Sequence, residues 1–150
     1  MQFHVSSNEG ESSSLLSLAK HRLTHPTIVE TETLEVNTTT LDLLLDSVLS
    51  KNQNEVSLLV VDLQGADLQA LRGSVETLKI TSAVFVEVSL TDFYQNQPLF
   101  RDVHQFLVPN GFTLIAHDLD ESRLMGDALY IKKVTPFIAE LQSLSHLMTM

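Results

Sequence analysis

Two short apolar runs with a helical repeat between them constrain the fold of this chain most. The first run is VSLLVVD at residues 56–62, and the second is AVFVEV at residues 83–88. Between them, apolar residues recur at the spacing of one helix face: Leu68, Leu71, Val75 and Leu78. A strand, a helix and a second strand predict a parallel pair with a right-handed crossover. The first run is apolar at both alternating positions, which predicts a strand covered on both faces.

Further elements extend this unit in both directions. An amphipathic pattern predicts a helix from Leu41 to Leu49 with Thr40 as its N-cap, and another helix lies between Pro98 and Gly111. Two more strands are expected at residues 112–117 and 127–133, and their short connection requires an antiparallel pair. The predicted fold class is therefore α/β, a partial doubly wound, Rossmann-like sheet that is mostly parallel and has an antiparallel C-terminal strand pair.

The chain has 150 residues, which is the size of one domain. Residues 1–39 are serine-rich and polar, with expected strands at 2–6 and 27–36 and a short helix at 15–23. Residues 40–133 form the predicted α/β core. Residues 134–150 carry an apolar stripe that predicts a C-terminal helix.

Charge and composition exclude several classes of function. The net charge of −10 argues against binding nucleic acid or an anionic membrane surface, because both need a basic protein face. Cysteine is absent, which excludes disulfides, thiolate nucleophiles and cysteine metal sites. No apolar run approaches the length of a membrane span, and the first residues do not resemble a signal peptide, so we expect a cytoplasmic protein. The five glycines lie too far apart for a nucleotide-binding loop.

Several segments, taken together in order, resemble the FkbM-type methyltransferases. They are NTTTLDLLL at 37–45, LLVVDLQGADLQAL at 58–71 followed by Arg72-Gly73, VEVS at 86–89, QPLF at 97–100, NGF at 110–112 and DALY at 127–130. The resemblance implies a Rossmann-like fold. It also implies transfer of a methyl group from S-adenosylmethionine to a hydroxyl oxygen, such as that of a sugar or a secondary metabolite.

The sequence departs from that family in two respects. Family members carry an N-terminal half whose glycine turn holds S-adenosylmethionine, and this chain resembles only the part that follows it. We therefore expect weak or no binding of the methyl donor by this chain alone, and association with a missing N-terminal half or with a second copy. The family's D-x-E-G motif reads Asp62-Leu63-Gln64-Gly65 here, so an amide replaces one carboxylate.

Two carboxylates are the catalytic candidates. Asp62 follows the first predicted strand, and Glu87 interrupts the second near the same end, where ligands bind in open α/β sheets. Either could hold or accept a hydroxyl proton. The alternatives are that Asp62 caps the following helix and that Glu87 forms a salt bridge with Arg101 or Arg123.

Other polar residues are weaker candidates. The resemblance points to Tyr94 as a substrate-binding residue. His117, followed by Asp118, could bind substrate or act as a base, although a solvated loop is the favoured explanation. His21 and His25 have helical spacing, but no third ligand is apparent, so no metal site is expected. The serines at 6–14 could line a pocket or form an exposed loop, and Gln64 and Gly65 are interpreted as structural.

Three functions stay open at this point. The chain could be part of a methyltransferase that acts on a small hydroxyl acceptor. It could instead be a non-catalytic assembly module derived from such an enzyme. Finally, it could be a different enzyme that uses the crevice between Asp62 and Glu87 without the methyl donor.

Overall fold

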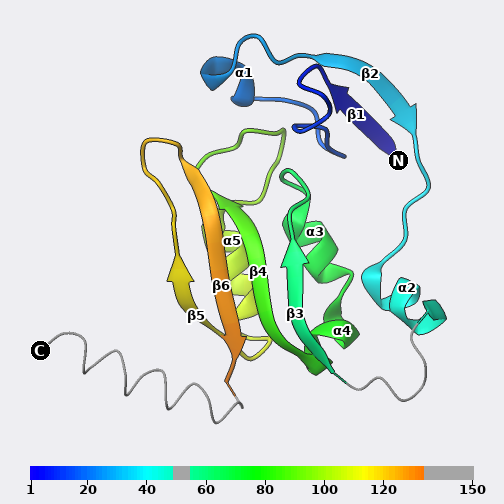
Figure 1. Ribbon diagram of the computed structural model, residues 1–150, viewed down its shortest axis with the longest axis vertical. Helices are drawn as coiled ribbons and strands as arrows, with labels where there is room; N and C mark the ends of the chain where they lie inside the picture. The colour runs from blue at the N-terminus through cyan, green and yellow to red at the C-terminus, as the bar shows by residue number, and fades with distance from the viewer. Residues whose placement is uncertain (49–54, 134–150) are drawn as a thin grey trace, which may run out of the picture.

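A computed structural model describes residues 1–48 and 55–133. Its main body is a four-stranded sheet with the order β3-β4-β6-β5, and a separate two-stranded sheet, β1-β2, lies beyond one end of it (Figure 1). The strands are β1 (Gln2–Ser6), β2 (Glu30–Glu35), β3 (Val56–Val61), β4 (Thr81–Ser89), β5 (Phe112–His117) and β6 (Met125–Lys132). The helices are α1 (His21–Thr24), α2 (Leu41–Val48), α3 (Asp67–Arg72), α4 (Val75–Ile80) and α5 (Phe100–Leu107). The expected C-terminal helix at 134–150 lies outside the described residues.

The four-stranded sheet is mixed. β3 pairs in parallel with β4, as expected from the strand-helix-strand pattern. β6 lies between β4 and β5 and runs antiparallel to both of them. The predicted antiparallel pair of C-terminal strands is confirmed, and the short connection between them is the reason.

No described helix is long and apolar enough to cross a membrane.

The helices correct one expectation and confirm another. The single helix predicted across residues 68–78 is two short helices, because α3 ends at Gly73 and α4 begins after Ser74. Gly73 lies close to Thr40, so an added Cβ would lie 3.2 Å from the Thr40 side chain. Thr40 itself caps α2 as predicted, accepting a hydrogen bond from the backbone N–H of Leu43.

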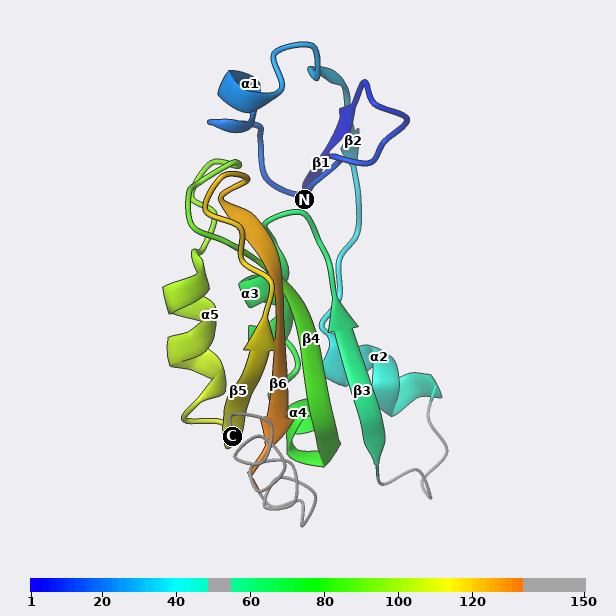
Figure 2. The ribbon, with the colours of Figure 1, turned by 60° about the vertical axis from the view of Figure 1, so that its left-hand side comes forward.

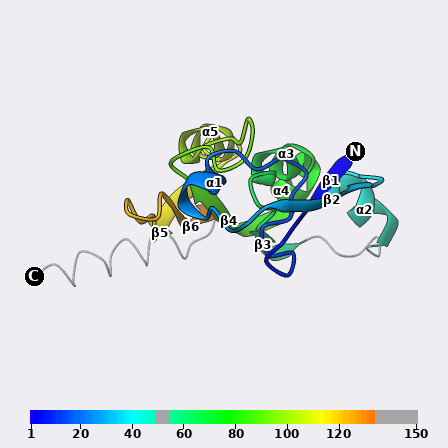
Figure 3. The same cartoon turned by 90° about the horizontal axis from the view of Figure 1, so that it is seen from above.

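Within the described residues, the core lies on one face of the sheet. Viewed from above, α3, α4 and α5 lie on the same side of the strands (Figure 3). Their apolar side chains pack against Val61, Val84, Val86 and Tyr130, which are nearly or fully buried. The expectation that β3 is covered on both faces is wrong: Leu58 is 51% exposed and Val60 is 60% exposed.

The N-terminal region packs against the carboxyl end of the sheet rather than beside it. β1 and β2 pair with each other in antiparallel fashion, so neither pairs with β3 (Figure 2). The predicted helix at 15–23 is reduced to α1. The residues before it form turns and bends, and Leu18 makes an isolated bridge with Tyr94. This packing brings serine-rich loop residues to the ends of β3 and β4.

Candidate functional site

The loop between β3 and α3 forms the centre of the site. Gln64 and Gly65 both adopt left-handed backbone conformations, with φ of +50° and +91°. For a residue with a side chain such as Gln64, this conformation costs about 1–2 kcal/mol. The loop is held from both sides. Ser14 donates a hydrogen bond to the Gln64 carbonyl (2.8 Å), and the Asp67 carboxylate accepts the N–H groups of Leu63 and Gly65.

This backbone geometry directs the Gln64 side chain between the two predicted carboxylates. Its amide nitrogen, Nε2, donates to Asp62 Oδ1 at 3.0 Å and to Glu87 Oε2 at 3.4 Å. Its amide oxygen accepts a hydrogen bond of 2.9 Å from the Tyr94 hydroxyl. The opposite orientation of the amide would put its oxygen against two carboxylates, so the network fixes this one. Asp62 and Glu87 are therefore close neighbours, as the strand-end argument predicted.

The Glu87 carboxyl group is the most perturbed acid of the site. Burial, together with repulsion from the charges of Asp62, Asp67 and Asp127, raises its pKa to about 7. No ion pair to Glu87 forms within the described residues, so the alternative of a salt bridge is wrong: Arg101 pairs with Asp102 and Arg123 with Asp120. A carboxyl group with a pKa near neutrality can exchange a proton at physiological pH.

Glu87 opens onto a cavity of about 290 Å³ between the N-terminal region and the sheet. Its polar lining comes from two parts of the chain. The N-terminal region contributes Asn8, Glu11, Ser12, His21 and His25, and the sheet side contributes Gln64, Glu87, Ser89, Tyr94 and Gln97. Ile28, Phe93 and Met125 supply apolar surface. We call this cavity the polar pocket.

Tyr94 is a buried residue in the lining of the polar pocket. Its ring is 3% exposed, and its hydroxyl lies within hydrogen-bond distance of the Ser12 carbonyl (3.2 Å) as well as of Gln64. Burial raises the pKa of this phenol above its ordinary value, so the hydroxyl stays protonated and remains a donor. Gly65 permits this close approach, since a Cβ there would lie 3.0 Å from the Tyr94 ring.

His21 is a second buried polar group in the same pocket. Its side chain is 9% exposed, its Nε2 lies 3.3 Å from the Ser12 hydroxyl, and its buried Nδ1 has no hydrogen-bond partner. Burial and the neighbouring His25 lower the pKa of His21, which favours the neutral ring. No cluster of three potential metal ligands occurs among the described residues, and the histidine pair stays without a third ligand.

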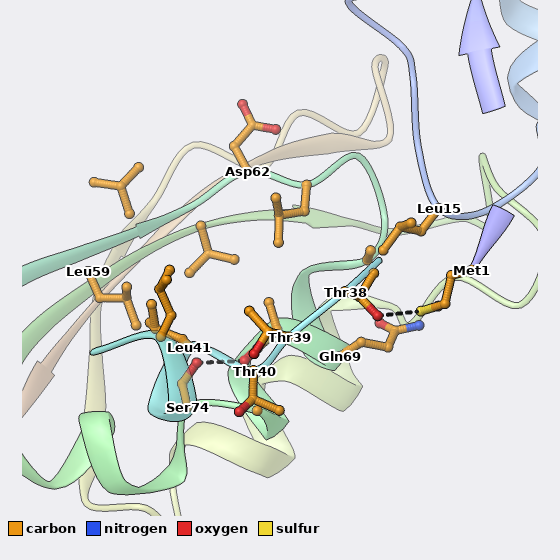
Figure 4. A pocket seen from close by; sticks show the side chains of 17 residues that line it. Met1, Leu15, Thr38, Thr39, Thr40, Leu41, Leu59, Asp62, Gln69 and Ser74 are labelled. Atoms are coloured by element: carbon orange, nitrogen blue, oxygen red, sulfur yellow. Dashed lines mark hydrogen bonds between the residues drawn. The ribbon is translucent and has the colours of Figure 1, made fainter. Parts of the chain in front are cut away.

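Asp62 lines a different cavity. This second cavity, of about 490 Å³, lies between the exposed edge of β3, the start of α2 and α3, and we call it the edge pocket. Apolar side chains such as Leu41 and Leu59 form most of it, and Thr38, Thr39 and Thr40 provide hydroxyl groups (Figure 4). The Asp62 carboxylate points away from these threonines (Figure 4). The expectation that Asp62 and Glu87 open onto one cavity is therefore wrong, because Gln64 lies between two pockets.

The remaining candidates take other positions. His117 ends β5 and lies against Phe100, with ring centres 6.0 Å apart, and it lines neither pocket. Asp62 does not cap the following helix, because Asp67 accepts the free N–H groups of that loop instead. Asp118, beside His117, accepts the backbone N–H of Asp127.

Sequence reasoning missed Gln64 as the residue that joins the site together. The change from carboxylate to amide in the D-x-E-G motif was the available signal, but its partners Glu87 and Tyr94 are 23 and 30 residues away. It also left the serine-rich loop undecided, whereas Ser6, Ser12 and Ser14 are buried and hydrogen-bonded.

The comparison with known proteins gives one family. The family model described as the methyltransferase FkbM domain matches residues 2–114, which include β1 through β4, the first residues of β5 and both pockets' central residues. No curated protein and no solved structure is significantly similar to this chain. The match includes Asp62, Gln64, Glu87 and Tyr94.

Proposed function

The chain belongs to the FkbM methyltransferase family, and from that premise we propose that it transfers a methyl group from S-adenosylmethionine to a hydroxyl oxygen of a sugar or a secondary metabolite. One observation carries the proposal: Glu87, with a pKa near 7, faces a polar pocket at the carboxyl ends of β3 and β4. A general base works best when its pKa lies near the working pH. Glu87 meets this condition, whereas an exposed carboxylate would be a much weaker base.

The polar pocket suits a small, uncharged hydroxyl compound as methyl acceptor. Among the described residues, its lining contains the carboxyl groups of Glu11 and Glu87 and no lysine or arginine, so an anionic acceptor would be repelled. The volume of about 290 Å³ is at the lower end of the usual range for small-molecule sites, which is about 300–1,000 Å³. Hydroxyl and amide groups beside Phe93 and Met125 match the mixed polar and apolar faces of a single sugar ring.

The edge pocket fits the methyl donor in size and charge. S-adenosylmethionine supplies, when bound, a methyl group on a positively charged sulfur. The edge pocket has room for a ligand of this size, apolar walls for an adenine ring, and the Asp62 carboxylate at its rim for a positive charge or a ribose hydroxyl. The chain offers no closely spaced glycines to hold the donor's polar groups, so we expect the affinity of this chain alone to be weaker than micromolar.

The residues of the site then take distinct roles. Glu87 accepts the proton of the acceptor hydroxyl through Oε1, the oxygen that has no hydrogen-bond partner among the described residues. Tyr94 and Ser12 fix the wall of the acceptor pocket, and Asp62 supplies negative charge on the donor side. Direct transfer requires the two reactants to meet in line, so the acceptor hydroxyl must reach past Gln64, which lies between the two pockets, and this alignment accounts for most of the expected rate gain.

The test is a label-transfer assay on the full chain. We would supply millimolar S-adenosylmethionine labelled in its methyl group, with uncharged sugars and, separately, uronic acids and sugar phosphates as acceptors. We expect label in an uncharged acceptor and not in the anionic ones. Glu87→Gln should reduce turnover about 100-fold or more, and the exposed Glu121→Gln should not. Absence of transfer to every acceptor, or full activity of Glu87→Gln, would contradict the proposal.

A second role in assembly is favoured by the open edge of the sheet. Among the strands that the structure describes, β3 has a neighbour on one side only, and its run from Val56 to Val61 carries no charge or proline that would discourage pairing. We therefore propose that the chain also associates through β3, with a second copy as the partner that is always available.

A further inference from the structure

We propose that Gln64 is a positioning residue that holds Glu87 ready to accept a proton, a role that an amide at position 64 performs and a carboxylate there would not. This inference deepens the proposed function of the same site. The geometry that carries it is the single amide group between Asp62, Glu87 and Tyr94.

The first step is that the Gln64 side chain has no freedom to leave this position. Its backbone is left-handed and is held by Ser14 on its carbonyl and by Asp67 on the flanking N–H groups. A residue kept in an uncommon conformation by several independent contacts is typical of functional sites. Here the contacts serve to place one amide rather than to fill the core, because Gln64 is itself partly exposed.

The second step concerns charge. The two N–H groups of one amide satisfy two neighbouring carboxylates without a proton and without a bound cation. A glutamate at position 64 would put a third carboxylate between Asp62 and Glu87. Like charges at this distance cannot all ionise, so the group of carboxylates would hold a proton or attract a cation at neutral pH. Gln64 thus leaves Glu87 free to be the group that gains and loses the proton.

The third step is the orientation of Glu87. Gln64 holds Oε2, and no other described group binds the carboxylate, so Oε1 is the oxygen available to a ligand in the polar pocket. The Tyr94 hydroxyl holds the other end of the amide and prevents it from turning over. Loss of Gln64 would remove a hydrogen bond from the anionic form of Glu87, which raises the pKa of that carboxyl group.

The experiment is a carboxyl-carbon NMR titration of the full chain, which needs neither donor nor acceptor. We expect the pKa of Glu87 to rise by about one unit in Gln64→Leu, since hydrogen bonds to charged groups have about this strength. In Gln64→Glu it should rise further, and the titration should split into two coupled steps. Gln69 lies exposed in α3 and contacts none of these groups, so Gln69→Leu and Gln69→Glu are the matched controls and should leave Glu87 unchanged.

A measurement on the unaltered protein guards against variants that do not fold. The side-chain nitrogen of Gln64 should report the ionisation of Glu87, so its resonance should move with pH around the pKa of Glu87. A Glu87 titration that is the same in Gln64→Leu as in the native chain, or a Gln64 nitrogen that does not respond, would overturn the inference. Failure of methyl transfer with the expected titrations intact would instead contradict the proposed function alone.

Discussion

The hydroxyl of Ser14 donates a hydrogen bond of 2.8 Å to the carbonyl oxygen of Gln64, fifty residues further along the chain. This contact connects the serine-rich N-terminal region with the loop that carries the site. It is part-buried, and Ser14 itself is 2% exposed, so water cannot easily replace it. The N-terminal region is therefore a structural component of the site.

Replacing Ser14 with alanine tests this connection. Ser14→Ala leaves the left-handed Gln64 carbonyl without its partner, and we expect a loss of about 1–3 kcal/mol in the free energy of unfolding. Urea titration followed by circular dichroism measures it. Ser57→Ala is the control, because Ser57 is exposed on β3. Equal stability of the two variants would show that the contact contributes nothing.

Gly65 tests how much the site depends on a close approach. Gly65→Ala adds both backbone strain at φ +91° and a Cβ 3.0 Å from the Tyr94 ring. Gly10→Ala adds similar strain at φ +89°, but its Cβ would lie 3.6 Å from the nearest atom, the Ser13 hydroxyl oxygen. We expect thermal unfolding to show a loss of about 1–2 kcal/mol for the strain in both variants, and a further loss only in Gly65→Ala. Identical losses in the two variants would mean that the Tyr94 ring moves aside without a measurable loss of stability.

Much of the fold follows from the sequence pattern, and the exceptions have physical causes. The helical and strand periods predicted α2, β5 and the parallel β3–β4 pair, because local patterns dominate in short regular elements. The break at Gly73 was missed, since a single apolar stripe runs across both α3 and α4. The exposed face of β3 was missed because the apolar pattern of a strand does not predict which of its two faces the helices cover.

The site was predicted only in part for a related reason. Asp62 and Glu87 follow from strand ends, which are local features with a known geometric meaning. The positions of Gln64, His21 and Ser12 depend on how the N-terminal region folds over the sheet. The periodicity of apolar residues does not predict such contacts between distant segments. His117 was predicted as a site residue because Asp118 follows it, but Asp118 in fact accepts a hydrogen bond from the backbone of β6.

The raised pKa of Glu87 predicts a specific dependence of stability on pH. The pKa is about 7 in the folded chain and near its usual value of 4.5 when unfolded, so the folded state holds a proton that the unfolded state has lost between these values. Stability therefore falls as the pH rises from 4.5 to 7. We expect Glu87→Gln to remove part of this fall, so that the variant is more stable than the native chain at pH 8.

Urea unfolding of both proteins between pH 4.5 and pH 8 measures the effect. Glu121→Gln is the control, because Glu121 is exposed in the connection before β6. Parallel stability curves for the native chain and Glu87→Gln would show that the carboxyl group ionises normally.

Asp62 should affect the reaction more than the binding of the acceptor. It lines the edge pocket, not the polar pocket, so Asp62→Asn leaves every residue that contacts the acceptor in place. We expect kcat to fall while the KM for the acceptor stays within about twofold, which is the pattern of a lost transition-state interaction. Asp46→Asn in α2 is the control, since Asp46 lines neither pocket. An unchanged kcat would remove Asp62 from the mechanism.

The exposed edge of β3 predicts self-association. Strand edges present unpaired N–H and C=O groups, and β1 and β2 pair with each other instead of covering this edge. The net charge of −10 opposes association, but at physiological salt such repulsion is screened beyond about 8 Å. We therefore expect sedimentation velocity at micromolar concentration to give a dimer.

A charged residue in β3 should abolish that dimer. Val60 is 60% exposed, so Val60→Lys adds a charge without disturbing the core, and a lysine on an edge strand discourages pairing with another strand. Leu23→Lys in α1, at a side chain that is 80% exposed, is the control and should stay dimeric. A native chain that sediments as a monomer, or a Val60→Lys variant that remains a dimer, would show that β3 is not the surface through which this protein associates.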